Sequence, residues 1–289
     1  MQEQDVLTRQ EGALLFWLLS YASLLAPSKH SLRSTFIDLE KSAVQWKSVA
    51  MELQGHHQSR KNTRQAALLG VALCVLEGLW CTCQSDFEGN WEATGAGIRK
   101  AAALHLFSAS HTGNGMKDSL INTANLVQKL LVMDRWIAFT DLRALGIHPS
   151  DVTIQFSLGI ARNLRSSIEQ IQIGLLESAR ELTLQYNDKR QSRKEVYHQL
   201  RSLLQTIDEH CSRIVARYTA ETGVKLDPSR CAQKGSAPHA AVLLSWLASC
   251  AFIACSTSTR LSSDPVAPAD VRLANFTWAN HLLILVPAM

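Results

Sequence analysis

The sequence is poor in charged residues and in proline: 19% of its 289 residues are Asp, Glu, Lys or Arg, and seven are proline. Disordered chains are rich in charge and proline and poor in large apolar residues, whereas 46% of this chain is hydrophobic. We therefore expect a packed globular protein with a substantial core. The formal net charge of +4 is small for this length, so the composition does not indicate a surface that coats nucleic acid.

Zinc-binding cysteine pairs are also missing. The chain has seven Cys but no C-x-x-C, Cys81-x-Cys83 has the wrong spacing, and no Cys precedes Cys74. Two other groups, 56–57 (His-His) and 208–211 (Asp-Glu-His-Cys), place their side chains on different sides of a helix, so we expect no metal site. The odd number of Cys, four of them within apolar helical patterns, indicates a reducing compartment.

Motifs of the common enzyme classes are absent as well. The sequence has no Gly-rich phosphate loop, no G-x-S-x-G, no H-E-x-x-H and no D-D-x-x-D, and no spacing joins its Ser, His and Asp residues. We therefore expect no catalytic residue and no cofactor. An all-α domain of this size has room for an apolar pocket that holds a small hydrophobic effector, but the sequence does not place one.

Three apolar runs, 13–26, 66–80 and 239–255, are candidates for membrane spans. The first is shorter than the roughly 20 residues that cross a bilayer, the second contains Glu77, and the third contains one His and two Ser. Acidic residues dominate the stretch before the first run, whereas a signal peptide begins with positive charge. We expect buried core helices and no membrane segment.

Apolar residues recur at the spacing of one helical face along most of the chain. The pattern predicts helices over 31–54, 63–81, 91–106, 117–140, 157–186, 193–222, 239–256 and 268–285. The helix over 91–106 is rich in small residues, which allow a neighbouring helix to approach closely. Only 151–156 alternates as a strand does. We therefore expect a single all-α domain over 1–289, built from antiparallel-packed helices.

The two longest predicted helices, 157–186 and 193–222, each carry an apolar stripe with polar residues between its members. The polar segment 187–192 joins them. A short polar connection between two such helices is typical of antiparallel neighbours, so we expect them to pack against each other through their stripes.

Two stretches resemble the middle homology region of fungal zinc-cluster transcription factors. GAGIRKAAALHLF, over 95–107, is similar to that family's G-x-A-I-R-x-A-x-x-L-G-L-H helix. DRWIAFTDLRALGIHPSDVTI, over 134–154, is similar to its helix end in D-R with the proline-marked loop that follows. The two stretches come in the family order, and the resemblance covers roughly residues 10 to 285 in outline. It departs from the family at 124–128, where ANLVQ replaces the usual Arg-Arg and Trp.

The resemblance implies a transcription regulator-like protein: an all-helical regulatory domain without its own zinc-cluster DNA reader, controlling a metabolic or secondary-metabolite pathway. It implies a nuclear location, with the cytoplasm as the alternative, and no sequence-specific DNA binding by this chain alone. A second hypothesis is a partner protein that pairs with a full-length zinc-cluster relative as a dominant-negative subunit. A third is a helical enzyme or accessory protein of small-molecule biosynthesis.

Two charged residues fall on faces that the pattern predicts to be apolar. Asp134 lies four residues after Leu130, and Arg99 is flanked at helical spacing by Gly and Ala. A buried charge is costly unless it is paired, and the resemblance places the two helices side by side. We therefore expect a structural ion pair between Arg99 and Asp134. The alternative is a catalytic carboxylate with an anion-binding Arg.

Overall fold

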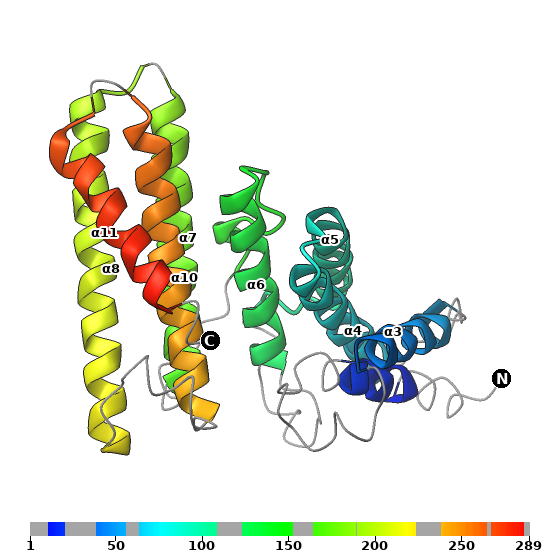
Figure 1. Cartoon of the computed structure of the whole chain (residues 1–289). Coiled ribbons are helices and arrows are strands. Elements are labelled where there is room, and N and C mark those ends of the chain that lie inside the picture. The colour runs from blue at the N-terminus through cyan, green and yellow to red at the C-terminus, as the bar shows by residue number, and fades with distance from the viewer. Residues whose placement is uncertain are drawn as a thin grey trace. The chain divides into compact units, whose positions relative to one another are not determined.

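Figure 1 shows the computed structural model of the chain, which describes residues 11–20, 39–55, 64–108, 123–152, 164–188, 190–223, 238–264 and 267–285. Within these ranges every regular element is a helix and none is a strand, which confirms the all-α class. In the strand-like stretch 151–156, Asp151 ends a short 3-10 helix, η2 (Pro149–Asp151). Residues 153–156 lie outside the described ranges.

The contacts group the chain into two compact units, where the sequence suggested one domain. The first unit comprises residues 1–137 with 145–156, and the second comprises 138–144 with 157–289. Domain boundaries usually fall in exposed linkers rich in Pro, Gly and polar residues. Here one boundary, between Ile137 and Ala138, falls within the last turn of α6, so composition gives no sign of it.

The first unit contains the helix Glu11–Ser20, α3 (Leu39–Gly55), α4 (Arg64–Cys83), α5 (Phe87–Ala103) and most of α6 (Thr123–Thr140). The short turn between α4 and α5 ends at Asp86, whose carboxylate accepts a hydrogen bond from the N–H of Gly89 at 2.9 Å and caps α5. A Cβ at Gly97 of α5 would lie 2.9 Å from Leu130 and 3.2 Å from Cys74. The small residues of α5 therefore do allow close approach, as expected.

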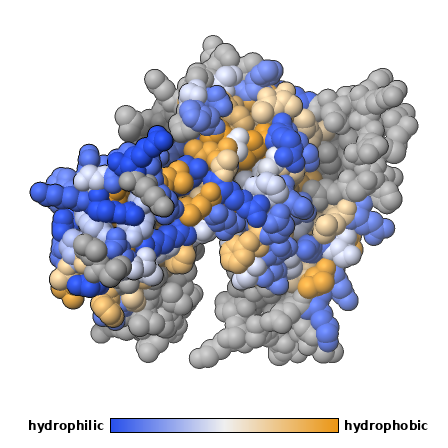
Figure 2. All heavy atoms as spheres, turned by 90° about the horizontal axis from the view of Figure 1, so that it is seen from above, coloured by the Kyte–Doolittle hydropathy of each residue, from blue (hydrophilic) through white to orange (hydrophobic). Residues whose placement is uncertain are grey.

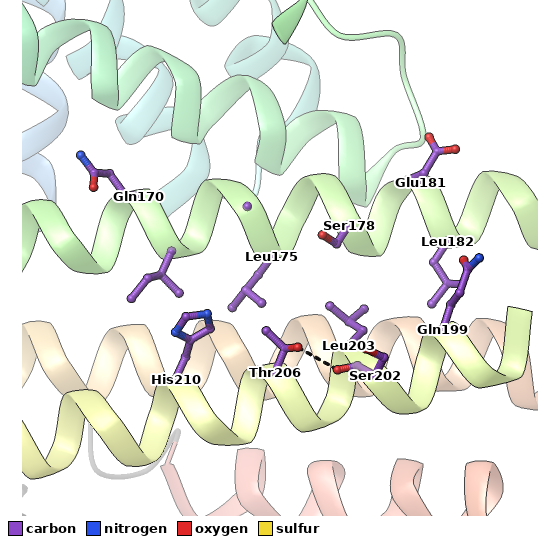
Figure 3. A pocket seen from close by; sticks show the side chains of 12 residues that line it. Gln170, Leu175, Ser178, Glu181, Leu182, Gln199, Ser202, Leu203, Thr206 and His210 are labelled. Carbon is purple, nitrogen blue, oxygen red and sulfur yellow. Dashed lines mark hydrogen bonds between the residues drawn. The ribbon is translucent and has the colours of Figure 1, made fainter. Parts of the chain in front are cut away.

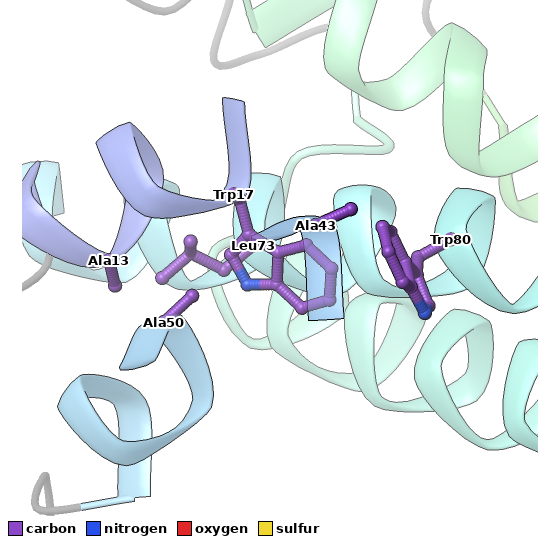
Figure 4. Close-up of a cluster of buried hydrophobic side chains, with 6 residues drawn as sticks. All are labelled: Ala13, Trp17, Ala43, Ala50, Leu73 and Trp80. Carbon is purple, nitrogen blue, oxygen red and sulfur yellow. The ribbon is translucent and has the colours of Figure 1, made fainter. Parts of the chain in front are cut away.

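Aromatic and small side chains form the core between the helix Glu11–Ser20, α3 and α4. The buried members are Ala13, Trp17, Ala43, Ala50, Leu73 and Trp80 (Figure 4). The rings of Trp17 and Trp80 meet edge to face with centroids 6.1 Å apart, and the hydroxyl of Ser20 donates to the carbonyl of Ala43 at 2.7 Å. Aromatic pairs of this geometry add to the stabilisation that comes from apolar burial.

Helix α4 is long and apolar enough to cross a membrane by length and composition, and it is the one such helix among the described residues. In this structure 56% of its most apolar window is buried inside the protein. Its buried residues include Leu69, Leu73 and Trp80, so α4 acts as the central helix of the first unit.

The second unit contains α7 (Leu164–Asn187), α8 (Arg193–Thr222), α10 (Pro238–Ser262) and α11 (Ala269–Leu285). Helices α7 and α8 lie side by side and run antiparallel, α10 packs against both, and α11 packs on α10 (Figure 1). The predicted pairing of the two longest helices is therefore confirmed. Helix α8 is capped at its C-terminus by Gly223, whose backbone is left-handed (φ 67°) and whose N–H donates to the carbonyl of Thr219.

The surface of α11 exposes two large apolar side chains one helical turn apart. Leu273 is 66% exposed and Phe276 is 69% exposed. On the face of the molecule shown in Figure 2, hydrophobic residues lie in separate patches among hydrophilic ones. Nε of Arg201 on α8 lies 2.5 Å from Oδ2 of Asp270, so an ion pair links α8 to the start of α11. The apolar end of the chain, 286–289, lies outside the described ranges.

Candidate functional site

The carboxylate of Asp134, on α6, is buried and receives three hydrogen bonds. Its Oδ1 accepts from the N–H of Gly146 at 2.8 Å. Its Oδ2 accepts from the N–H of Ile147 at 3.3 Å and from Nη1 of Arg135 at 2.5 Å. The same Nη1 of Arg135 donates to the carbonyl of Ile147 at 2.8 Å. Asp134 and Arg135 together therefore anchor the chain at 146–147 to the helix that precedes it.

The ion pair predicted between Arg99 and Asp134 needs correction. Asp134 is buried as expected, but its ionic partner is the neighbouring Arg135, while Arg99 is exposed on α5. The prediction was wrong because none of the small residues flanking Arg99 at helical spacing is fully buried. Ala102 and Ala103 are themselves exposed, and the buried face of α5 runs through Ile98 and Ala101 instead.

The surroundings of Asp134 suit a structural role better than a catalytic one. Burial raises the pKa of its carboxyl group, while the hydrogen bond from Gly146 and the charge of Arg135 oppose the rise. Asp134 is 6% exposed and Arg135 is 2% exposed, and both carboxylate oxygens already accept hydrogen bonds. A general base needs a lone pair that faces the substrate, and this carboxylate offers none to solvent.

Among the residues that the structure describes, no three His, Cys, Asp or Glu side chains are grouped as metal ligands would be. The pair 56–57 lies outside the described ranges. In the run 208–211, Asp208 and Glu209 are exposed while His210 turns toward α7, so adjacent residues face different surroundings.

A groove of about 590 Å³ runs between α7 and α8 in the second unit (Figure 3). Helix α7 lines it with Gln170, Ile171, Gly174, Leu175, Ser178, Glu181 and Leu182, and α8 lines it with Gln199, Ser202, Leu203, Thr206 and His210. Its volume falls within the range of about 300–1,000 Å³ that is typical of small-molecule sites. The antiparallel register of the two helices brings together residues that lie as far apart in the sequence as Gln170 and His210.

Apolar and polar side chains share the walls of this groove. Leu175 and Leu182 of α7 point toward α8, where Leu203 faces them (Figure 3). The hydroxyl of Thr206 is already bonded to the carbonyl of Ser202 at 2.8 Å. Gln170 and Glu181 lie at the rim and point away from α8 (Figure 3). The inner wall is therefore apolar with uncharged polar groups.

His210 is the most distinctive residue of the groove. Its ring reaches from α8 toward α7 (Figure 3), and its Nδ1 is buried without a hydrogen-bond partner among the described residues. Burial lowers the pKa of His210, and the neighbouring charge of Arg213 lowers it further, so the ring is held in its neutral form at neutral pH. Because this nitrogen has almost no accessible surface, a molecule in the groove does not reach it in this structure.

Gly174 of α7 lines the groove and is exposed. A Cβ built on Gly174 would meet no atom within 4 Å. The site was not predicted from the sequence. Its small lining residues, Gly174 and Ser178 on α7 and Ser202 on α8, are exposed and lie outside the apolar stripes, so the helical period gave no signal for it.

No protein-family model matches the sequence, and no curated protein and no solved structure matches the chain. Two features of the described residues bear on function: the anchor at Asp134 and the groove between α7 and α8.

Proposed function

We propose that this chain is the regulatory domain of a transcription regulator of the fungal zinc-cluster type, which controls a metabolic or secondary-metabolite pathway. The observation that carries the proposal is the hold of Asp134 and Arg135 on the backbone at 146–147. These residues belong to the stretch that resembles the family's D-R helix end and following loop. The resemblance therefore includes residues whose side chains hold the following loop in place. Chance matches on the surface of a helix would not be expected to do so.

A regulatory domain needs a site through which its state is changed, and the groove between α7 and α8 can serve as one. It has the volume of a small-molecule site and an inner wall in which leucines of both helices face each other (Figure 3). Helix α10 packs against both walls of the groove. A molecule bound between α7 and α8 would favour one spacing of these helices, and α10 would follow the change.

Binding suits the groove better than catalysis. The two titratable lining residues are Glu181, at the rim and pointing away from α8, and His210, at the other end of the groove (Figure 3). Acid and base groups that act together must both reach the reacting atoms within about 3 Å. The arrangement therefore favours an effector site over the active site that the hypothesis of a helical enzyme would require.

In this proposal DNA contact comes from a protein partner, such as a full-length zinc-cluster relative. Affinity for duplex DNA comes mainly from Lys and Arg that neutralise phosphates, and the formal charge of the chain is only +4. The 289 residues also contain no C-x-x-C motif. We therefore propose that the chain works in the nucleus through protein contacts.

The test is a reporter assay in which the full chain is fused to an unrelated DNA-binding domain. We expect the fusion to change transcription severalfold relative to the DNA-binding domain alone. Arg99→Ala should leave this output unchanged because Arg99 is exposed, whereas Arg135→Ala should abolish it by releasing the chain at 146–147. A wild-type fusion that is present in the nucleus and leaves the reporter unchanged would overturn the proposal.

A gel-shift experiment then separates a regulator from a dominant-negative partner. Purified chain is added to a zinc-cluster protein on its DNA site. A slower complex indicates a regulatory subunit that joins the partner on DNA. Loss of the shifted band indicates a subunit that removes the partner from DNA.

A further inference from the structure

We infer that Cys211 of α8 and Cys250 of α10 form a redox-sensitive pair of thiols, which a hydroperoxide oxidises to a disulfide that fixes the two helices to each other. The inference goes beyond the proposed function, because it needs neither a ligand in the groove nor a partner on DNA. It follows from the contact between the two thiols and from the difference in their exposure.

The two thiols meet where α8 and α10 pack against each other in the second unit (Figure 1). Across this contact the thiols of Cys211 and Cys250 share a hydrogen bond. Side chains whose sulfur atoms share a hydrogen bond point toward each other, whereas cysteines that point apart cannot be joined unless the backbone moves. The pair therefore meets the directional requirement for a disulfide.

Small side chains flank Cys250 on α10. Ala251 and Ala254 are buried, and the separation between packed helices depends on the size of the side chains at their contact. Small residues thus favour the short distance between Cα atoms, about 4.4–6.8 Å, that a disulfide needs. The two helices are also linked at another point, because Nε of Arg193 on α8 lies 3.9 Å from Oδ2 of Asp264, just after α10.

The two cysteines differ in their access to solvent, which gives each a separate role. Cys211 is half-buried, whereas Cys250 is fully buried. The hydrogen bond with Cys211 and burial raise the pKa of the Cys250 thiol, so Cys250 stays protonated. Attack on an oxidant requires a thiolate and access to the reactant. Cys211 is therefore the sulfur that a dissolved oxidant reaches first.

Hydrogen peroxide, as the simplest hydroperoxide, supplies the oxidising equivalents. The Cys211 thiolate attacks one peroxide oxygen, so that an S–O bond forms and the O–O bond breaks. The departing hydroxide takes up the proton that Cys211 released and becomes the first water. The product at Cys211 is a sulfenic acid.

The second step joins the two helices. The sulfur of Cys250 attacks the sulfenic sulfur of Cys211, the S–S bond forms and the S–O bond breaks. The departing hydroxide takes the proton of Cys250 and becomes the second water. Two thiols have then lost two electrons in total, and one peroxide has been reduced to two waters. A dithiol reductant reverses the bond, so in a reducing compartment the pair rests as two thiols.

The disulfide would close a long loop. Thirty-eight residues lie between Cys211 and Cys250. A cross-link over such a length restricts the unfolded chain more than the folded one, so the oxidised protein should be more stable. It would also hold α10 on α8, which forms one wall of the groove.

The test compares the reduced full chain with the same chain after treatment with hydrogen peroxide. Free thiols are alkylated in denaturant, and the digested protein is analysed by mass spectrometry without reduction. We expect peptides joined through Cys211 and Cys250, which dithiothreitol separates. The melting temperature should rise by at least about 5 °C on oxidation and return on reduction.

Two results with the wild type would overturn the inference. One is a peroxide-treated chain in which Cys250 is still alkylated or Cys211 is joined to a different cysteine. The other is a chain with the expected joined peptides and no rise in melting temperature, because such a bond would not stabilise the contact between α8 and α10.

Three variants show that the effect of peroxide comes from this pair. Cys211→Ser and Cys250→Ala each remove one sulfur, so peroxide should produce no joined peptides and shift the melting temperature by less than about 1 °C. The matched control Cys83→Ser removes the exposed cysteine of α4 and should behave as the wild type. Circular dichroism establishes that each variant is folded, and Cys211→Ser, at a half-buried position, decides the matter if Cys250→Ala does not fold. A rise in the melting temperature of Cys211→Ser with peroxide, or no joined peptides in Cys83→Ser, would contradict the inference.

Discussion

The anchor at Asp134 makes a sharp prediction about two glycines that undergo the same substitution with opposite results. Alanine at Gly146 adds a Cβ that would lie 2.8 Å from Oδ1 of Asp134 and 2.9 Å from Cδ1 of Ile98. Alanine at Gly174 adds a Cβ with no atom within 4 Å. Gly146→Ala should therefore destabilise the protein, and Gly174→Ala should stabilise it.

The magnitudes follow from what must move. To clear the new methyl group at residue 146, the Asp134 carboxylate has to withdraw from the N–H groups at 146 and 147, although Arg135 holds it in place. Overpacking of this kind costs about 1–3 kcal/mol, and weakening a hydrogen bond to a charged group adds about 1–2 kcal/mol. Gly174 lies inside helix α7, where alanine is favoured over glycine by about 0.5–1 kcal/mol.

The assay is urea unfolding followed by circular dichroism, with the wild type and both variants measured side by side. We expect the free energy of unfolding to fall by about 2–4 kcal/mol for Gly146→Ala and to rise by up to about 1 kcal/mol for Gly174→Ala. In a double-mutant cycle, Asp134→Ala should reduce the cost of Gly146→Ala, because it removes the atom that the methyl group meets. Equal effects of the two glycine substitutions, or strict additivity in the cycle, would refute this account of the anchor.

Three further predictions test other parts of the structure. Arg135→Ala should lower the free energy of unfolding by about 3–5 kcal/mol, because it leaves the buried carboxylate of Asp134 without its ionic partner. The matched control Arg99→Ala should change it by less than about 0.5 kcal/mol, because Arg99 is exposed. Urea titration compares the two variants, and equal losses of stability would contradict the assignment of Arg135 as the partner. Since the folded state lowers the pKa of His210, the stability from this residue is fully present above its unfolded pKa of about 6.5 and is lost as the pH falls through the folded value. His210→Gln should therefore lose less stability than the wild type between about pH 7.5 and about pH 5, and identical losses would show that His210 does not contribute to the pH dependence. Leu203→Asp places a carboxylate at a buried position of α8 and should cost several kcal/mol, so an unchanged melting temperature would contradict its place in the core.

Most of the helices could be predicted because their apolar residues keep the helical period and their ends carry local signals. Helix α8 spans the predicted residues 193–222 because Gly223 takes the left-handed conformation that ends it. Helix α5 begins at Phe87, before the predicted residue 91, because the apolar pattern says nothing about the cap that Asp86 provides.

The end of α10 shows why polar stretches are harder to predict. The helix continues to Ser262, past the predicted end at 256, through a run rich in Ser and Thr. These residues usually signal a loop, yet here the hydroxyls of Thr257 and Thr259 donate to carbonyls four residues earlier, at 2.7 and 2.8 Å, and Thr257 is fully buried. Tertiary packing overrides the local preference.

The candidate site could be predicted only in part, because its geometry depends on contacts between distant segments. The sequence indicated that Asp134 needs a partner, but not that Arg135 and the backbone at 146–147 provide it. The groove depends on the register between α7 and α8, which brings Gln170 and His210 into the same lining. A helical period gives the buried face of each helix but not the alignment of one helix against the other.

The measurement that tests the central claim most directly is the reporter output of the fused chain with the groove open and with the groove filled. The comparison uses the wild type, Gly174→Ala and Gly174→Leu at equal nuclear levels. Because the leucine side chain would occupy the space of the ligand and the alanine methyl group would not, we expect Gly174→Leu to change the output at least about twofold and Gly174→Ala to leave it unchanged. Identical output from all three fusions would contradict the claim that the groove between α7 and α8 controls the regulatory state of this domain.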